Sequence, residues 1–245
     1  MAAKNFRAVL LVFMLSWVMV ACTVGQPSTP APSQTPASSD SSEALAEFPL
    51  AKGTTWAYAY VSYEPTTADP TQVMTATYLF TETVVDTQVT PPYFVAQVQR
   101  EERLIQAPPD WPQTESSRPH EYWYIVKDRQ VYESFQKPAS IIPTDTLTLA
   151  YDFPLALGRS WCPLKYMEGE KVQDCTAKRT VVSQESYETP AGKFDNCYEI
   201  TEDVNSGGVT QWFCKSIGVV AQKYDHGGTR FGFQQVLVSY SKGSP

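Results

Sequence analysis

Alternation of large and small side chains is the strongest pattern in the chain. Trp56, Tyr58 and Tyr60 are separated by the small residues Ala57 and Ala59. Successive side chains of a β-strand point to opposite faces of the sheet, so this period of two predicts a strand with one buried face. β-Branched and aromatic runs bounded by Pro, Gly or Asn predict further strands at 73–83, 93–103, 121–135, 146–151, 177–186, 196–203, 209–214, 219–224 and 231–239.

Helical patterns are nearly absent from the same stretch. Only residues 42–47 could form a helical turn. Short strands separated by turn residues favour antiparallel pairing between neighbours along the chain. The sequence therefore predicts an all-β fold, with an antiparallel, strongly curved sheet or open half-barrel and few or no helices.

An internal repeat divides the predicted sheet into two related halves. The segment Phe48-Pro-Leu-Ala-Lys-Gly-Thr-Thr-Trp56 recurs 105 residues later as Phe153-Pro-Leu-Ala-Leu-Gly-Arg-Ser-Trp161, with six of nine positions identical. Such self-similarity indicates a duplicated structural unit. We therefore predict one β domain over residues 43–245, with halves at about 48–135 and 153–240. The match continues in order through 83–85 with 180–182, 93–98 with 194–199, and 122–124 with 211–213.

Cysteine positions follow the predicted hairpins. An even number of cysteines in an exported chain predicts a disulfide framework. Residues 168–169 lie midway between Cys162 and Cys175, and residues 205–206 lie midway between Cys197 and Cys214. Both midpoints are turn-forming pairs. We predict disulfides Cys162–Cys175 and Cys197–Cys214. The alternative, a metal or redox site, requires closely spaced cysteines or clustered histidines. The chain has five cysteines; with Cys22 of the N-terminal segment described next set aside, the remaining four are Cys162, Cys175, Cys197 and Cys214.

The N-terminus carries a candidate export signal. Lys4 and Arg7 precede an apolar run, 8–21, that ends in a small residue directly before Cys22. This segment resembles a bacterial lipoprotein signal. The resemblance implies that residues 1–21 are a signal peptide and that the Cys22 thiol receives diacylglycerol, with palmitate among the acyl chains. The alternative is a transmembrane helix, but 15 residues span only ~22 Å against a hydrocarbon core of ~30 Å.

A low-complexity segment follows the anchor. The 20 residues 23–42 contain nine Ser or Thr and four Pro, with Val24 as the only large aliphatic residue. Such a composition buries too little apolar surface to fold. Residues 22–42 are therefore predicted to be the lipidated cysteine and an unstructured spacer. The expected location is the extracytoplasmic side of the bacterial cell envelope, with the lipid holding the protein on a membrane.

Charge and motif content exclude several classes of function. The net charge is −7 at pH 7, and loss of Lys4 and Arg7 with the leader lowers it to −9. An acidic exported chain is not expected to bind nucleic acid. The sequence contains no nucleophile elbow, P-loop or dinucleotide fingerprint, and only two histidines, His120 and His226. We expect no cofactor, no metal site and no catalytic residue, although a pair of carboxylates for glycoside hydrolysis is defined only in space.

Trp111 is the one residue that these patterns single out as a candidate ligand contact. It lies in the proline-rich insertion 106–113, which the second half of the chain lacks. An aromatic side chain on a stiff loop can form a platform for a sugar ring or an apolar ligand. The alternative is that Trp111 folds back over the edge of the sheet.

Three segments together resemble a group of bacterial extracytoplasmic lipoproteins. They are Pro49-Leu-x-x-Gly-x-x-Trp56, Thr189-Pro-Ala-Gly-x-Phe-x-x-Cys197 and Gly218-Val219-Val220. The resemblance implies an exported, anchored protein and implies no activity. A curved sheet is also similar, at the level of fold, to half-barrel carriers of the Lol type, which hold lipid on a concave face. We expect a noncatalytic binding or carrier domain for an apolar, glycan or protein ligand. The alternatives are a structural component of the envelope and a hydrolase of envelope polysaccharide.

Overall fold

The computed structural model describes residues 39–66, 69, 71–111, 120–138, 147–163, 167–168, 171–172, 175, 177–204 and 207–244. The signal peptide, Cys22 and the spacer up to residue 38 lie outside the described residues. The elements are α1 Ser39–Glu47, β1 Thr55–Pro65, β2 Val73–Thr90, β3 Tyr93–Gln106, β4 Glu121–Lys127, β5 Gln130–Ser134, β6 Thr148–Asp152, β7 Ser160–Trp161, β8 Met167–Glu168, β9 Lys171–Val172, β10 Arg179–Thr189, β11 Gly192–Val204, β12 Gly207–Cys214, β13 Gly218–His226 and β14 Gly232–Ser241.

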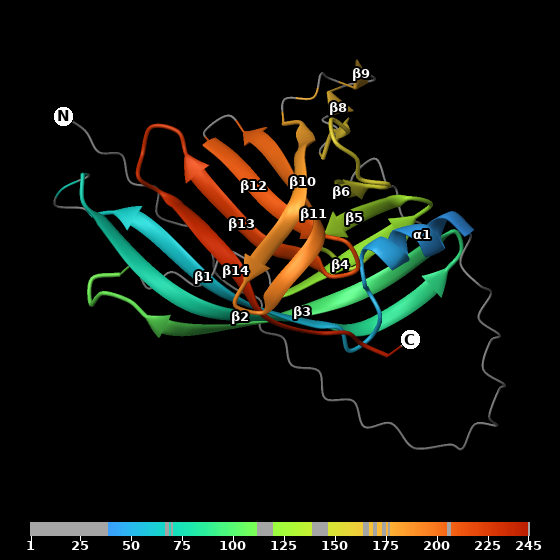
Figure 1. Cartoon of the computed structure of the whole chain (residues 1–245), viewed down its shortest axis with the longest axis horizontal. Helices are drawn as coiled ribbons and strands as arrows, with labels where there is room; N and C mark the ends of the chain where they lie inside the picture. The colour runs from blue at the N-terminus through green and yellow to red at the C-terminus, as the bar shows by residue number, and fades with distance from the viewer. Residues whose placement is uncertain are drawn as a thin grey trace, which may run out of the picture. The chain divides into compact units, whose positions relative to one another are not determined.

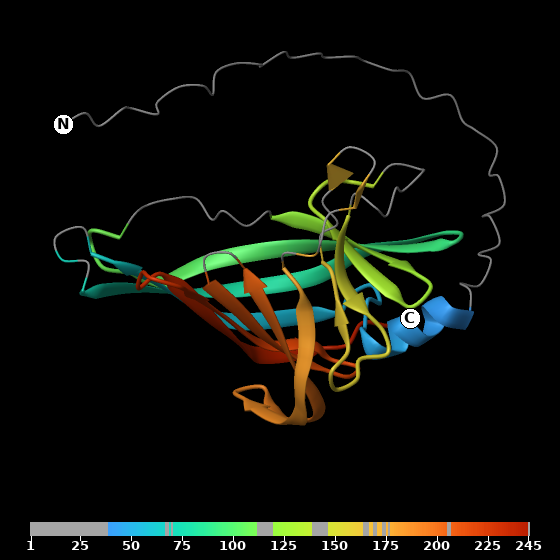
Figure 2. The same cartoon turned by 90° about the horizontal axis from the view of Figure 1, so that it is seen from above.

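Twelve of these strands form one antiparallel sheet in the order β6-β5-β4-β3-β2-β1-β14-β13-β12-β11-β10-β7. The strands of the first half, β1–β6, are consecutive neighbours, and the two halves join where β1 pairs with β14. β8 and β9 form a separate hairpin. The sheet curls strongly (Figure 1), and in the second view the green strands of the first half face the orange and red strands of the second half across its concave side (Figure 2). The predicted all-β, curved and duplicated fold is confirmed.

The repeat extends to individual backbone hydrogen bonds. In the first half, Gly53 N donates to Val84 O at 2.8 Å, and Val84 N donates to Thr54 O at 2.9 Å. Gly53 and its counterpart Gly158 have φ angles of +84° and +79°, a left-handed conformation that glycine adopts without steric cost. The two halves therefore begin with the same turn. In the second half, Gly158 N donates to Val181 O and Val181 N donates to Arg159 O, both at 2.9 Å.

The two edges of the sheet approach each other, so the half-barrel is nearly closed. Leu149 N in β6 donates to Pro163 O, just beyond β7, at 2.7 Å. Arg179 in β10 donates from Nη1 to Ala150 O in β6 at 2.9 Å. A guanidinium group thus spans part of the seam where backbone pairing stops.

Helix α1 packs beside β4 and β5 at one end of the barrel. The helix begins at Ser39, whereas the sequence suggested one turn from residue 42 and an unstructured spacer up to that point. Ala44 and Phe48, which are 0% and 3% exposed, bury the C-terminal end of the helix, and Phe48 N donates to Ala44 O at 2.9 Å. Glu43 pairs with Arg129 at 3.0 Å and fastens α1 to the β4–β5 turn.

The stretch predicted as one strand, 121–135, is a hairpin of β4 and β5. Lys127 pairs with Gln130, so only two residues form the turn. Asp128 adopts φ +53°, which Asp tolerates better than most residues. The chain has neither Gly nor Pro there, and this explains why the turn was missed.

Both disulfides have the pairing that the sequence suggests. Cys197 and Cys214 lie directly opposite each other on β11 and β12, and their hairpin is centred at 205–206 as expected. Cys162 and Cys175 are also bonded. The hairpin between them, β8–β9, is centred one residue later than the midpoint of the two cysteines. Both cysteines of this second pair lie outside regular strands.

Candidate functional site

A cavity of about 740 Å³ lies within the curved sheet, in the size range of pockets that bind small ligands. Both halves of the chain contribute to it. The first six strands and the segments next to them contribute mostly aromatic side chains, whereas the last strands contribute mostly amides. Its lining residues are Phe48, Trp56, Tyr58, Glu82, Arg100, His120, Tyr122, Tyr124, Glu133, Phe135, Ala150, Tyr151, Arg179, Gln211, Val219, Gln222 and Gln235.

Phe48 anchors the aromatic side of the cavity. It follows α1 directly, and its ring lies edge-on to Tyr124 at 4.9 Å and to Tyr151 at 5.4 Å between ring centroids. It also packs against Phe213 from the second half, at 5.7 Å. Edge-to-face contacts of this kind favour fixed ring positions. We call the cavity-lining rings of the first half the aromatic wall: Phe48, Trp56, Tyr58, Tyr122, Tyr124, Phe135 and Tyr151.

The phenols of the aromatic wall stay protonated. Burial raises the pKa of Tyr58, Tyr122 and Tyr124 well above the ordinary tyrosine value, and nearby groups such as Glu82 raise it further. Burial also raises the pKa of Tyr151, whose hydroxyl donates to Gln211 Oε1 at 3.0 Å. A neutral phenol can both donate and accept a hydrogen bond. The aromatic wall is therefore polar without being charged at its hydroxyls.

Three glutamines form the opposite side of the cavity. Gln211 on β12 pairs with Gln222 on β13, and Gln222 pairs with Gln235 on β14. Residues directly opposite each other in neighbouring strands project to the same face, so the three amides form a row across the sheet. We call this set the glutamine row. Each amide offers both donors and an acceptor.

A buried ion pair lies in the wall of the first half. Arg100 Nε donates to Glu82 Oε1 at 2.9 Å, and Nη2 contacts the same oxygen. The two side chains are only 11% and 13% exposed. Burial acts to lower the pKa of Arg100, but Glu82, Tyr122 and Tyr124 together outweigh it and raise the pKa overall. The guanidinium carbon also lies over the ring of Tyr122 at 5.3 Å, so this cation is held by a carboxylate and an aromatic face.

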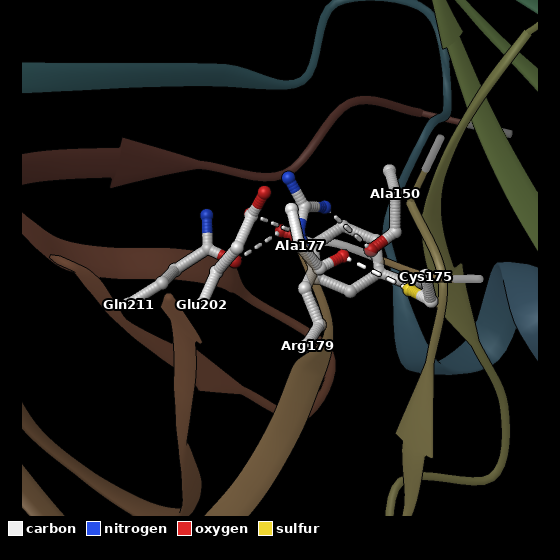
Figure 3. A network of polar contacts seen from close by, with 7 residues as sticks. Ala150, Cys175, Ala177, Arg179, Glu202 and Gln211 are labelled. Atoms are coloured by element: carbon white, nitrogen blue, oxygen red, sulfur yellow. Dashed lines mark hydrogen bonds and ion pairs between the residues drawn. The ribbon is translucent and has the colours of Figure 1, made fainter. Parts of the chain in front are cut away.

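A second ion pair lies at the closing seam of the barrel. Arg179 Nε donates to Glu202 Oε2 at 2.7 Å while Nη1 bonds to Ala150 O. Figure 3 shows the guanidinium between Glu202 and Ala150, with Gln211 nearby. Arg179 lines the cavity, and its pair with Glu202 joins β10 to β11. Both arginines of the cavity therefore already have carboxylate partners.

Trp111 does not line the cavity. Its side chain is 6% exposed, and its indole Nε1 donates to the Tyr78 hydroxyl on β2 at 3.0 Å. The structure thus places Trp111 against β2 and outside the cavity lining, and a ligand contact of Trp111 stays a prediction. Of the four repeated tryptophans, Trp56, Trp123 and Trp161 are buried, as expected of core residues, and Trp56 also lines the cavity.

The sequence missed the residues that do line the cavity. Phe135 is 58% exposed at its rim, although it lies in a predicted strand with no repeat partner to draw attention to it. The glutamine row was also missed. Its signal was available, because Gln211, Gln222 and Gln235 each interrupt an apolar or aromatic strand, and a polar residue on a buried face is the informative observation.

The described part of the chain contains no group of three or more His, Cys, Asp or Glu side chains arranged to hold a metal ion. None of the helices in this part has the length and apolar composition needed to cross a membrane.

Comparisons with known proteins identify no family for this chain. No protein-family model matches it, and no curated protein matches it. Among solved structures, a candidate exported protein with a YmcC-like fold from Bacteroides fragilis has a TM-score of 0.43 and 15% identity, covering 80% of this chain and 98% of that one. A candidate lipoprotein from Parabacteroides distasonis has a TM-score of 0.40 and 11% identity, covering 79% and 97%.

MucB is a further structural match, with a TM-score of 0.30 and 9% identity, covering 84% of this chain and 58% of that one. TM-scores below 0.5 are too low to infer fold or function for this chain. The fold described above and the function proposed below both rest on the residues of this chain itself.

The geometry favours a polar, uncharged ligand with at least one flat apolar face. The aromatic wall lines one side of the cavity, and the amides of the glutamine row add polar groups on the other. Catalysis by Glu82 would require breaking its ion pair with Arg100. The cavity lining thus combines aromatic rings and amides with the ionisable side chains of Glu82, Arg100, His120, Glu133 and Arg179.

Proposed function

We propose that this protein is a noncatalytic, lipid-anchored extracytoplasmic lipoprotein that binds a neutral saccharide in its cavity. The observation that supports the ligand class is the aromatic wall facing the glutamine row. A sugar ring has a face of C–H groups and a rim of hydroxyls. The C–H face is attracted to the negative face of an aromatic ring, and hydroxyls match groups that both donate and accept.

Other ligand classes fit the cavity less well. An acyl chain would leave the glutamine row and the Glu82–Arg100 pair against hydrocarbon, and burying polar groups without partners costs about 1–3 kcal/mol each. An anionic ligand would need free cations. Arg100 and Arg179 already pair with Glu82 and Glu202.

The location rests on the leader and on Cys22. The basic start, the short apolar run and the small residue before Cys22 support export and lipid attachment. Metabolic labelling with radioactive palmitate is expected to label the protein and to leave Cys22→Ser unlabelled and in the soluble fraction. A Cys22→Ser protein that still fractionates with membranes would contradict lipid anchoring at this residue.

The saccharide proposal can be tested with the full chain purified in mild detergent. The protein is applied to an array of neutral, uronic-acid and phosphorylated oligosaccharides. The affinity for each oligosaccharide that binds is then measured by calorimetry. Phe135→Ala is expected to weaken binding by about five- to tenfold, because one aromatic contact of about 1 kcal/mol is lost. Phe135 is exposed, so the fold should be unaffected.

Leu157→Ala is the matched control, because Leu157 is 68% exposed and does not line the cavity. It should bind as the wild type does. Binding of uronic or phosphorylated sugars only, or of none, would refute the proposal. Recovery of the bound oligosaccharide at its original length supports a noncatalytic role, whereas shortened products would indicate a hydrolase.

A further inference from the structure

A run of aromatic rings continues from the cavity along the concave face of the sheet. Neighbouring rings are in contact distance: Tyr60 lies 4.6 Å from Phe80 and stacks on Phe233 at 5.3 Å between centroids. Tyr224 lies 6.0 Å from Phe233 and 6.1 Å from Phe231. We call this set the aromatic ramp: Tyr60, Tyr78, Phe80, Tyr224, Phe231 and Phe233.

The ramp begins at the cavity lining. Tyr60 on β1 pairs directly with the cavity residue Gln235 on β14. Tyr224 is two residues beyond Gln222 on β13, and Phe233 is two residues from Gln235, so each projects to the same face as the glutamine row. From Gln222 to the end of β13 the strand extends roughly 13 Å at ~3.3 Å per residue. Cavity and ramp therefore form one continuous surface.

The ramp is partly exposed, most of all at its far end. Tyr60, Tyr224 and Phe233 are half-buried, and Phe231 is 40% exposed at the far end. Aromatic side chains packed side by side in this manner lose little entropy on binding because they are already held in place. The surface is thus suited to a ligand that presents successive flat faces.

A buried carboxylate oxygen borders the ramp. Glu102 on β3 pairs with Phe80 on β2, and its Oε2 atom is buried and has no hydrogen-bond partner among the described residues. Burial raises the pKa of the neighbouring Tyr78, and the Glu102 carboxylate raises it further. A buried acceptor without a donor is unfavourable. Because this oxygen is buried, a ligand on the ramp surface does not reach it, and Glu102 acts there only through its charge.

We infer that the ligand is a linear oligosaccharide chain, with one end in the cavity and further sugar units stacked along the aromatic ramp. This inference rests on the proposed saccharide-binding function and adds the length and direction of the ligand. A single sugar would occupy the cavity alone and leave the ramp unused.

The test compares short and long chains on the full protein in mild detergent. Cello-, malto-, xylo- and chito-oligosaccharides are each titrated as the disaccharide and the hexasaccharide. For at least one series, the hexasaccharide is expected to bind at least about tenfold more tightly, since two or more ring contacts are added.

Variants of the ramp separate length from cavity binding. Phe231→Ala and Tyr224→Ala should each weaken hexasaccharide binding by about three- to tenfold and leave disaccharide binding unchanged. Tyr187→Ala is the control: Tyr187 packs on Trp212, which is adjacent in β12 to Gln211 and so projects to the opposite face of the sheet. Phe231 lies exposed at the strand end, so Phe231→Ala should not affect the fold. If Tyr224→Ala lowers the melting temperature, the effect of Phe231→Ala alone decides whether the ramp binds the hexasaccharide.

The outcomes distinguish this inference from the proposed function. Equal affinity for disaccharide and hexasaccharide, with ramp variants unchanged, overturns the extended chain and leaves cavity binding intact. Loss of disaccharide binding in Phe231→Ala also overturns it, because the ramp would then be part of the primary site. If neither the disaccharide nor the hexasaccharide of any of the four series binds, and the protein binds an acyl chain or a peptide instead, both the inference and the proposed function are overturned.

Discussion

The two halves of the molecule place opposite charges at the same positions. In the first half, Trp56 pairs with Glu82, which pairs with Arg100 on the next strand. In the second half, Trp161 pairs with Arg179, which pairs with Glu202. The order of acid and base is reversed, yet each half keeps one ion pair in the row that begins with its repeated tryptophan. The duplicated backbone thus requires a neutral pair and tolerates either polarity.

The halves differ more in what they present to the cavity. Trp56 Nε1 donates to Ile217 O at 2.6 Å, whereas Trp161 Nε1 is buried and has no partner among the described residues. β1 is 11 residues long because both of its sides are paired, and β7, at the edge of the sheet, has two. The first half supplies the aromatic wall of the cavity, and the second half supplies the glutamine row.

The largest expected effect comes from breaking the ion pair of the first half. Glu82→Ala leaves the Arg100 charge buried without its partner and should lower the free energy of unfolding by about 3–5 kcal/mol. Glu202→Ala should cost less, because Arg179 is 21% exposed and keeps its bond to Ala150 O. Urea denaturation of both variants measures the difference.

The reversed order in the second half suggests a rescue. Glu82→Arg combined with Arg100→Glu gives the first half the polarity of the second and should recover more than half of the lost stability. Recovery should be incomplete, because the contact of Arg100 with the Tyr122 ring, about 0.5–2 kcal/mol, is lost. A double variant as unstable as Glu82→Ala would show that the two rows are not equivalent.

The next largest effect concerns disulfides, which only the second half has. Replacing either pair with alanine should cost about 3 kcal/mol from loop closure. Cys197 and Cys214 are fully buried, so their removal should cost about 1 kcal/mol more for the cavity left behind. Thermal unfolding measures both. A single transition in every variant means that the halves unfold as one unit, whereas early loss of β10–β13 alone would show independent halves.

A further effect is a dependence on alkaline pH, to which the buried phenols of the first half contribute most, while burial also raises the pKa of Tyr187 and Tyr240 in the second half. Burial raises the pKa of Tyr58, Tyr122 and Tyr124, so the folded protein retains protons that the unfolded chain loses above about pH 10. The contribution of these phenols to the free energy of unfolding should be constant below about pH 9. At higher pH it should fall by about 1.4 kcal/mol per pH unit for each phenol. Melting temperature between pH 7 and 11 measures this, with Tyr122→Phe giving a shallower fall. Phenolate absorbance that rises before unfolding would contradict buried phenols.

Local patterns were sufficient where one strand or hairpin carries the information. The period of two identified the β1 residues Trp56 and Tyr58, and symmetry about a turn paired Cys197 with Cys214. The same reasoning failed at Asp128, because a two-residue turn without Gly or Pro has no strong local signal. It also began α1 too late, since an average composition hid the burial of Ala44 and Phe48.

By itself, the sequence determined the strand content, the duplication and the disulfide pairs, because these depend on spacing within short segments. It also carries the export and lipid-attachment signals, which remain predictions. Only the tertiary structure decided which faces meet. Gln211, Gln222 and Gln235 become one row, and Arg179 reaches Ala150 across the seam, because closure of the sheet joins strands far apart in the chain. Alternation shows that residues share a face of one strand, but curvature and register determine whether that face encloses a cavity.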